Sequence, residues 1–445
     1  MADTETARSA MLRLSALVGE RTIFENDGYR RLWISRLLSH TPTNAIVYTM
    51  LLLVVEATGK SFSSSLFVVA YIAPSALLGT ISGAMVDRLP KSLLLAGTTA
   101  ARGALCVLLA LSTDSVLMIY VIAVLFAVAS QFSGPAEAAA LPAVVPPDQF
   151  TAANSVNNLG SLVSQAAGLI VLPALFLKTV GPETLAIVCA VMFGLATFNF
   201  LLIQGLRGPV SAVDMTIEDA REKFAQAWTR LSRDSVSYIS TVIVVLANTT
   251  GLVVVTLLPR FATQVLGVSA ENAVFVITPA AAGIWLALRF VRRLSGRVSP
   301  LWSIGGSFAA LIAGVALLSL VRPMGSTLEA WNILGLFDPG PFGEGTARII
   351  ITMALAAGLA FAFTFVNVVG RSIVNERMPI EMQGRVFAGQ AVLTNLASIP
   401  PILLTGLLAD VIGVPPVFFF IAVVCAILAV IYSARNLAMP ARTAY

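Results

Sequence analysis

The chain has 445 residues, of which 57% are hydrophobic and 11% are charged. Soluble domains carry about 25% charged residues, so this apolar excess excludes a single soluble core and predicts a polytopic membrane protein. The net charge of +5 is spread along the whole chain and does not indicate a nucleic-acid partner.

Residues 1–31 are polar, carry charges of both signs and contain no secretory signal, so we expect a cytoplasmic N-terminal tail. Within this tail, the stretch from Met11 to Val18 fits either a short interfacial helix or loosely ordered chain, and the sequence leaves both open.

Twelve apolar runs follow at even intervals, each close to the length of about 20 residues that crosses a bilayer as a helix. Their expected bounds are 33–56, 63–86, 92–112, 115–138, 151–176, 183–205, 238–263, 272–291, 301–321, 347–370, 386–411 and 415–434. The predicted fold class is therefore all-α, with twelve transmembrane helices.

Basic residues concentrate in the loops after even-numbered runs and in the C-terminal tail. They are Arg88, Lys91, Arg207, Arg221, Lys223, Arg230, Arg233, Arg292, Arg293, Arg297, Arg371, Arg377, Arg385, Arg435 and Arg442. The positive-inside rule thus predicts a protein of the inner (cytoplasmic) membrane with both termini in the cytoplasm. The loop after the fourth run is the exception, because it holds Glu137 and Asp148 and no basic residue.

A charged linker on the cytoplasmic side, with an expected helix from Thr216 to Leu231, divides the chain into two halves. The predicted parts are the tail 1–31, a six-helix bundle 32–205, the linker 206–236, a six-helix bundle 237–434 and the tail 435–445. Short matches between the halves, such as residues 58–61 with 266–269, indicate an internal repeat. Paired six-helix halves are typical of rocker-switch transporters. The Pro- and Gly-rich stretch 322–346 is expected to form an irregular outer loop.

The short turn between the second and third runs reads Gly83-Ala-Met-Val-Asp87-Arg88-Leu-Pro-Lys91. Its pattern, G-xxx-D-R-xx-K at this place in a twelve-span chain, resembles the loop between helices 2 and 3 of the major facilitator superfamily.

Further motifs resemble the family's bacterial branch of multidrug, macrolide and siderophore exporters. They are Tyr29-Arg-Arg-Leu-Trp33 running on to Ser39, Gly134-Pro-Ala136, Leu141-Pro142, Val145-Pro146, Ala153-Asn154, Leu258-Pro-Arg-Phe-Ala262, Leu266-Gly267, Pro379 and Gly384-Arg-Val386. The resemblance implies two pseudo-symmetric bundles and export by alternating access. Two positions depart from the pattern: Pro42-Thr43 stand where the branch often has Gly-Asp, and Ser295 stands where Asp87 falls in the first half.

The resemblance also implies a gate at the inner face, because it brings helices 2 and 11 together there. Asp87 would face the start of the eleventh run near Gly384 and Arg385, where a helix N-terminus carries partial positive charge. A plain surface loop is the alternative for this motif, which also includes Gly83, Arg88 and Lys91.

Arg102 is a charge within the third run, and a charged side chain in a span must face protein or water. Three roles are open: pairing with Asp87 or Glu137, snorkelling to the inner interface, or direct contact with substrate.

Proton coupling needs a group that changes charge along the pathway. The spans that we assign contain no acidic residue in the middle of runs 1, 4, 7 or 10, which counts against proton antiport. The remaining candidates are Asp87, Glu137 and His40, of which His40 titrates near neutral pH.

Polar and aromatic residues in the runs that would line a central cavity are its candidate substrate contacts. They are Asn44, Tyr48, Tyr71, Gln131, Asn158, Gln165, Asn248, Trp285, Asn367 and Asn395. Their neighbours are otherwise apolar, which favours an amphipathic or hydrophobic solute, although Asn and Gln also join helices by hydrogen bonds.

Three functions remain in competition. The first is export of amphipathic small molecules by a monomer in the lipid bilayer, with or without proton coupling. The second is flipping of lipids or lysophospholipids by the same fold, and the third is a non-transporting membrane sensor or assembly partner.

Overall fold

The computed structural model describes residues 21–146, 149–177, 179–203, 206, 225–226, 228–268, 276–294, 299–331 and 345–437. Over these ranges the chain is helical and forms no strand. The predicted interfacial helix from Met11 to Val18 lies outside them.

The helices of the first half match the six expected runs. They are η1 (Arg21–Glu25), α2 (Asp27–Thr58), α3 (Ser61–Arg88), α4 (Lys91–Ala110), α5 (Val116–Val144), α6 (Phe150–Ala166), which continues through η3 (Ala167–Val171) into α7 (Leu172–Phe176), and α8 (Pro182–Leu202).

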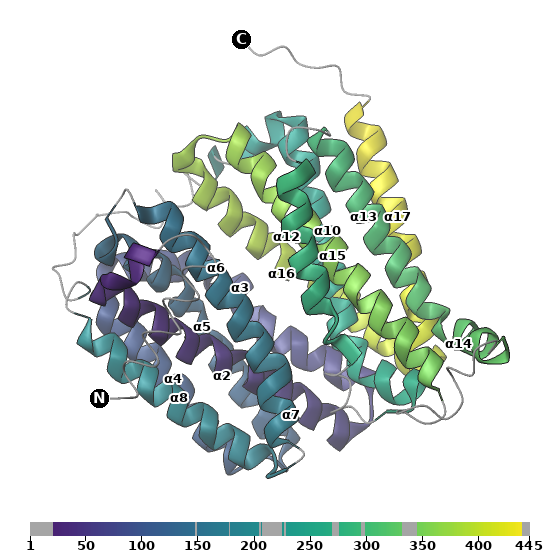
Figure 1. Ribbon diagram of the computed structural model, residues 1–445, viewed down its shortest axis with the longest axis horizontal. Coiled ribbons are helices and arrows are strands. Elements are labelled where there is room, and N and C mark those ends of the chain that lie inside the picture. Colours follow the sequence, from purple (N-terminus) through teal and green to yellow (C-terminus); the bar gives the residue numbers. More distant parts are fainter. Residues whose placement is uncertain are drawn as a thin grey trace. The chain divides into compact units, whose positions relative to one another are not determined.

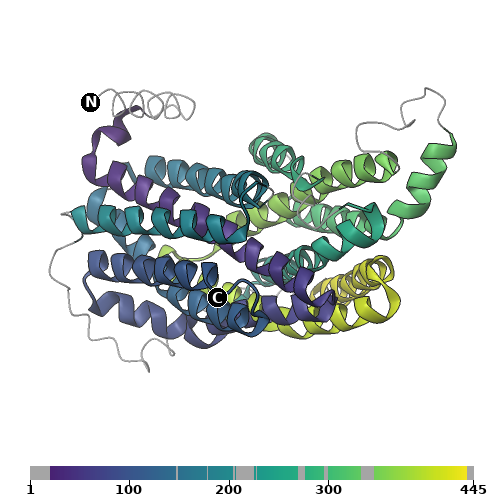
Figure 2. The same ribbon diagram turned by 90° about the horizontal axis from the view of Figure 1, so that it is seen from below.

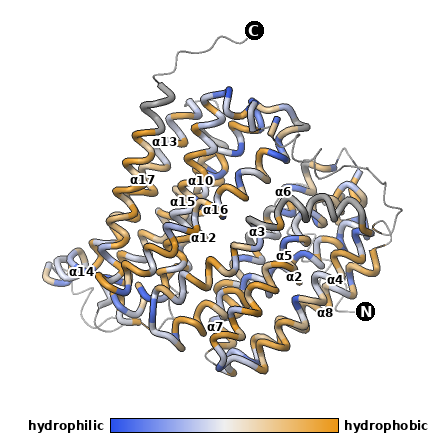
Figure 3. Tube along the Cα trace, turned by 180° about the vertical axis from the view of Figure 1, so that it is seen from behind, coloured by the Kyte–Doolittle hydropathy of each residue, from blue (hydrophilic) through white to orange (hydrophobic). Residues whose placement is uncertain are grey.

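The second half supplies six further helical segments and one short extra helix. They are α10 (Ser235–Phe261) with η5 (Ala262–Leu266), α12 (Ala280–Leu294), α13 (Pro300–Ser319), α14 (Val321–Ala330), α15 (Thr346–Arg377), α16 (Ile380–Ile412) and α17 (Val414–Leu437). Among the described residues nine helices are long and apolar enough to cross a membrane, and Ser61–Ser75 and Ala280–Val291 are shorter apolar helices. This confirms the all-α polytopic fold class. Helices such as α8 and α17 are hydrophobic along most of their length (Figure 3).

Two expectations about local structure need correction. Glu137 does not lie in a loop: α5 runs on to Val144 and buries it. The start of the outer stretch 322–346 is helical, as α14, although residues 332–344 lie outside the described part. Of the predicted linker helix, residues 225–226 and 228–231 are described, and they are helical.

The chain forms two compact units whose division differs from the boundaries expected from sequence. Unit 1 comprises Met1–Leu53 and Leu77–Ile217, and unit 2 comprises Val54–Ala76 and Glu218–Tyr445. The division therefore falls inside α3, so that its first half belongs with the second bundle.

Unit 1 is held together by tight pairing of α4 with α8, which lie side by side (Figure 1, Figure 2). The rings of Phe126 and Phe193 meet edge to face, with centroids 5.9 Å apart, and Cys106 and Cys189 are buried as free thiols. Near the start of α2, Phe24 of η1 packs edge to face against Trp33.

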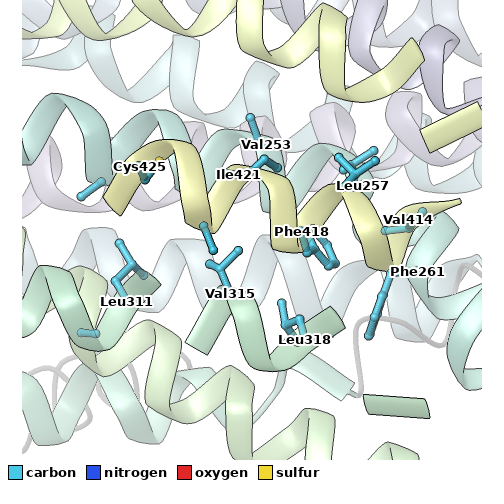
Figure 4. Packing of buried hydrophobic residues seen from close by; sticks show 14 of the residues in the cluster. Val253, Leu257, Phe261, Leu311, Val315, Leu318, Val414, Phe418, Ile421 and Cys425 are labelled. Atoms are coloured by element: carbon cyan, nitrogen blue, oxygen red, sulfur yellow. The ribbon is translucent and has the colours of Figure 1, made fainter. Parts of the chain in front are cut away.

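Unit 2 has a core in which α17 packs against α10 and α13 (Figure 4). The Phe418 ring of α17 lies 5.6 Å from that of Phe261 in α10, and Leu318 of α13 belongs to the same cluster. These contacts are apolar throughout, as expected where association relies on close van der Waals packing.

Two helices contain a π-helical turn near a proline. The turn η3 ends two residues before Pro173, and the turn η5 begins three residues after Pro259. Proline cannot donate a backbone hydrogen bond and leaves a free carbonyl in the turn before it, which accounts for η3 but not for η5. Gly267, at φ +71°, then ends η5 in the left-handed conformation.

Helices α12 and α15 approach closely at Gly283, so a larger residue there is predicted to lower stability. A Cβ atom at Gly283 would overlap the carbonyl oxygen of Ala357, whereas one at Gly358 would meet no atom within 4 Å. We expect Gly283→Ala to destabilise the protein by about 1–3 kcal/mol, because backbone cannot move aside easily. Gly358 follows Ala357 in α15, and Gly358→Ala should leave stability unchanged or raise it. Thermal unfolding in detergent measures both, and equal midpoints for the two variants would contradict the packing argument.

Candidate functional site

A buried arginine forms the centre of a polar cluster in unit 1. Arg102 of α4 is only 4% exposed, and its guanidinium donates hydrogen bonds to three hydroxyls. Its Nη1 lies 3.1 Å from Thr43 Oγ1, and its Nη2 lies 3.0 Å from both Ser39 Oγ and Ser133 Oγ. The guanidinium also lies over the Phe193 ring, 5.1 Å from its centroid. This side chain is held by α2, α4, α5 and α8, so it joins four helices.

A buried carboxylate lies close by in the same unit. The Glu137 side chain of α5 is 5% exposed, and its Oε2 lies 2.9 Å from His40 Nε2 and 3.2 Å from Arg36 Nε. The His40 side chain is 39% exposed, which makes it the accessible member of the group. A buried carboxylate is tolerated only when it is paired and hydrogen-bonded. Here Arg36 and His40 of α2 provide the paired charge and the hydrogen bond.

Helical spacing explains why these side chains meet. Positions 36, 39, 40 and 43 recur on one face of α2, while positions 98 and 102 in α4 and 133 and 137 in α5 are each one turn apart. Each helix thus turns one polar face toward the others. Arg102, Glu137 and His40 were predicted site residues from the sequence, whereas Arg36, Ser39 and Ser133 were not. The spacing of polar residues along otherwise apolar helices was the signal that could have found them.

The structure changes the expected environment of Arg102. It does not snorkel to the surface, and the hydroxyl partners given above were not among the expected ones, Asp87 and Glu137. Thr43, which stands where the exporter branch often has an acid, is one of these partners. Glu137 of α5, one of the expected partners, interacts with Arg102 through its charge, and the Asp87 side chain lies outside the described part of the structure.

The predicted inner-gate residues lie at helix ends. Gly83, Asp87 and Arg88 belong to the last turns of α3, and their side chains lie outside the described part of the structure. Lys91 is the first residue of α4, and Gly384 and Arg385 lie in the first two turns of α16. The gate remains a prediction.

Several predicted cavity residues of unit 2 form hydrogen bonds to other helices, and their role in a cavity stays a prediction. Asn248 of α10 donates to Asn367 Oδ1 of α15 over 3.0 Å, and Asn395 of α16 donates to Ser75 of α3. Next to Asn248, Thr249 lies 2.8 Å from Ser398 of α16. These residues therefore join helices, as amide and hydroxyl side chains do within membranes.

The remaining candidates are dispersed. Tyr48 is buried in α2, and Asn44 donates to the His40 carbonyl one turn earlier. Tyr71 and Gln131 are half-buried and Gln165 is exposed, while the Asn158 side chain lies outside the described part. Trp285 is 58% exposed on α12, with Arg289 over its ring. Within the described ranges no group of three or more His, Cys, Asp or Glu side chains could hold a metal ion.

The described residues thus form a polytopic helical bundle whose first unit contains buried ionic groups. Residues 32–343 match the family model of the Major Facilitator Superfamily. The chain belongs to the major facilitator superfamily. It is thus a multi-pass membrane protein whose family carries out secondary transport by alternating access.

Solved structures share the fold at low sequence identity. A mutant of the nucleoside transporter NupG has a TM-score of 0.71 and 13% identity over 92% of this chain and 99% of that chain. A bacterial homolog to the human lysosomal transporter Spinster has a TM-score of 0.67 and 15% identity over 92% and 97%. A bacterial homologue of the iron transporter ferroportin has a TM-score of 0.68 and 13% identity over 93% and 99%. No curated protein matches the sequence.

The hydroxyls of Ser39, Thr43 and Ser133 form a cage around the Arg102 guanidinium, and this hydroxyl cage predicts that lysine cannot replace Arg102. A planar guanidinium reaches three oxygens on two helices at once, whereas an ammonium is a single compact donor. We expect Arg102→Lys to lower the free energy of unfolding by about 2–3 kcal/mol, since an ammonium cannot reach all three hydroxyls and leaves buried ones without a hydrogen-bond donor. Arg289→Lys, at an exposed position of α12, is the matched control and should leave stability unchanged. Thermal unfolding in detergent tests both, and equal stability of the two variants would refute the cage as a stabilising element.

Proposed function

We propose that this transporter exports amphipathic or hydrophobic small molecules across the cytoplasmic membrane in exchange for protons, as a monomer with both termini in the cytoplasm. The observation that carries the coupling is the pair of Glu137, buried in unit 1, with the accessible His40. An imidazole and a carboxylate in hydrogen-bond contact can pass a proton between them, and the exposed side of His40 gives that proton a route to water.

The basic residues around Glu137 determine how its protonation changes the attraction between helices. It faces Arg36 and His40 of α2, and the Arg102 guanidinium of α4 lies near enough to affect it electrostatically. When Glu137 is ionised, attraction to Arg36 and His40 holds α5 to α2. When it is protonated, both attractions weaken, so α2 and α5 can separate more easily. Proton binding is thereby linked to movement between two helices that line the pathway in this family.

The substrate class follows from the neutral polar groups of the bundle helices. In α10, α15 and α16 the half-buried polar contacts are amides and hydroxyls, such as Asn248 with Asn367 and Thr249 with Ser398. Neutral hydrogen-bonding groups among apolar residues favour a ligand with a large apolar surface and few charges. A phosphate or dicarboxylate substrate would need paired arginines instead.

A lipid or lysophospholipid flippase is the alternative that shares this surface chemistry, and a non-transporting sensor is the third. The two transport functions differ in the substrate that moves and in its dependence on a proton gradient, and the sensor predicts no flux. One assay therefore separates all three.

Flux into proteoliposomes, with and without a pH gradient, is the decisive measurement. With ethidium as an amphipathic probe, we expect the wild-type protein to accumulate dye against its gradient only when a pH gradient is imposed. Glu137→Gln cannot release a proton, so it should lose accumulation by at least about tenfold while retaining downhill flux.

Glu183→Gln is the matched control, because Glu183 is an exposed acid in the first turn of α8 that accepts a bond from Thr113. It should accumulate dye like the wild type. Accumulation without a pH gradient, or unchanged accumulation by Glu137→Gln, would contradict proton coupling. Movement of a fluorescent lysophosphatidylcholine but not of ethidium would favour the flippase, and flux of neither would favour the sensor.

A further inference from the structure

An aspartate at the end of α16 caps the N-terminus of α3, although 349 residues separate the two positions. Asp410 Oδ1 accepts the backbone N–H of Ser61 over 2.6 Å, and Oδ2 accepts that of Phe62 over 2.9 Å. Both carboxylate oxygens thus bind orphan donors of the first turn, where the helix carries partial positive charge. All three residues belong to unit 2.

A third helix closes this contact. Arg260 Nη2 of α10 lies 3.8 Å from Asp410 Oδ1, and Arg260 Nε lies 3.4 Å from Ser61 Oγ. The Arg260 and Asp410 side chains are 22% and 21% exposed. The aspartate therefore holds α3 and α10 to the end of α16, and its charge is balanced by an arginine and a helix N-terminus.

Below the cap, α3 and α16 run antiparallel in a regular seam of small residues. Gly406 packs so closely against α3 that a Cβ atom there would overlap the Ser65 side chain. Further along, Asn395 donates to Ser75. Ser61, Ser65 and Ser75 of α3 contact Asp410, Gly406 and Asn395 of α16 in that order. The residue numbers rise along α3 as they fall along α16, so the three contacts share one antiparallel register.

We propose that Asp410 is a gating residue of the transport cycle, which fastens the first half of α3 to α16 at the predicted outer face and releases it when that face opens. The seam is narrow and built from serine and glycine, so it can part and re-form without repacking large side chains. The cap supplies directional bonds that exist only when the seam is closed. This inference rests on alternating access alone and does not depend on the substrate or on proton coupling.

Accessibility of a single cysteine within the seam tests the proposal. Val68, a partly buried residue of α3 between Ser65 and Ser75, is replaced by cysteine in a chain whose Cys106, Cys189 and Cys425 are alanine. A membrane-impermeant maleimide is added from the predicted outer side. Asp410→Asn retains the size of the side chain but loses the charge and one acceptor, so labelling should become about fivefold faster.

Gly406→Ala provides a second variant that opens the seam by a different cause, because its methyl group pushes α3 away while Asp410 remains. It should also accelerate labelling. Asp114→Asn, in the turn after α4 of unit 1, changes the same charge at the same predicted face and should label at the parent rate.

Thermal unfolding distinguishes gating from a structural role. Faster labelling in Asp410→Asn with an unchanged unfolding midpoint supports the proposal. An unchanged labelling rate in Asp410→Asn overturns it. Faster labelling accompanied by a lower unfolding midpoint indicates a purely structural role for Asp410 and also overturns it. If Asp410→Asn does not fold, Arg260→Gln replaces it with the same expected outcomes.

Discussion

The structure of unit 1 depends on the need to satisfy buried ionic groups. An unpaired charge in an apolar interior costs several kcal/mol, so Arg102 and Glu137 dictate what surrounds them. Arg102 is met by hydroxyls of Ser39, Thr43 and Ser133, and Glu137 by Arg36 and His40. Because these partners come from different helices, the same bonds that stabilise the charges also fix the helices against one another.

The two units solve their packing differently. Unit 1 joins its helices through a buried cluster of ionic and hydroxyl groups, whereas unit 2 combines an apolar core around Phe261 and Phe418 with amide and hydroxyl pairs and with the half-buried ion pair of Arg260 and Asp410. The Glu137 carboxylate of unit 1 is more deeply buried than that of Asp410. For this reason the proposed proton coupling is placed in unit 1.

Capping of helix N-termini by aspartates is a second recurrent interaction in this structure. A helix that starts at a membrane surface exposes N–H groups, and a carboxylate from another helix both satisfies them and interacts with the helix dipole. Asp234 does this locally for α10, by accepting from the Ser237 N–H, and Asp410 does it for α3 from the far end of α16. The local cap sets where one helix begins. The distant cap makes the position of one helix depend on another, which is the property that a gate requires.

The sequence by itself determined the class of protein, the number of spans and the superfamily, because hydrophobic length and the motif from Gly83 to Lys91 are local properties of the chain. It also singled out Arg102, Glu137 and His40, since ionic groups are rare in apolar runs. Only the tertiary structure decided that Glu137 pairs with Arg36 and His40, that hydroxyls surround Arg102, and that Asp410 caps α3. Those facts depend on which helices become neighbours, and residues 349 positions apart carry no local signal of their contact.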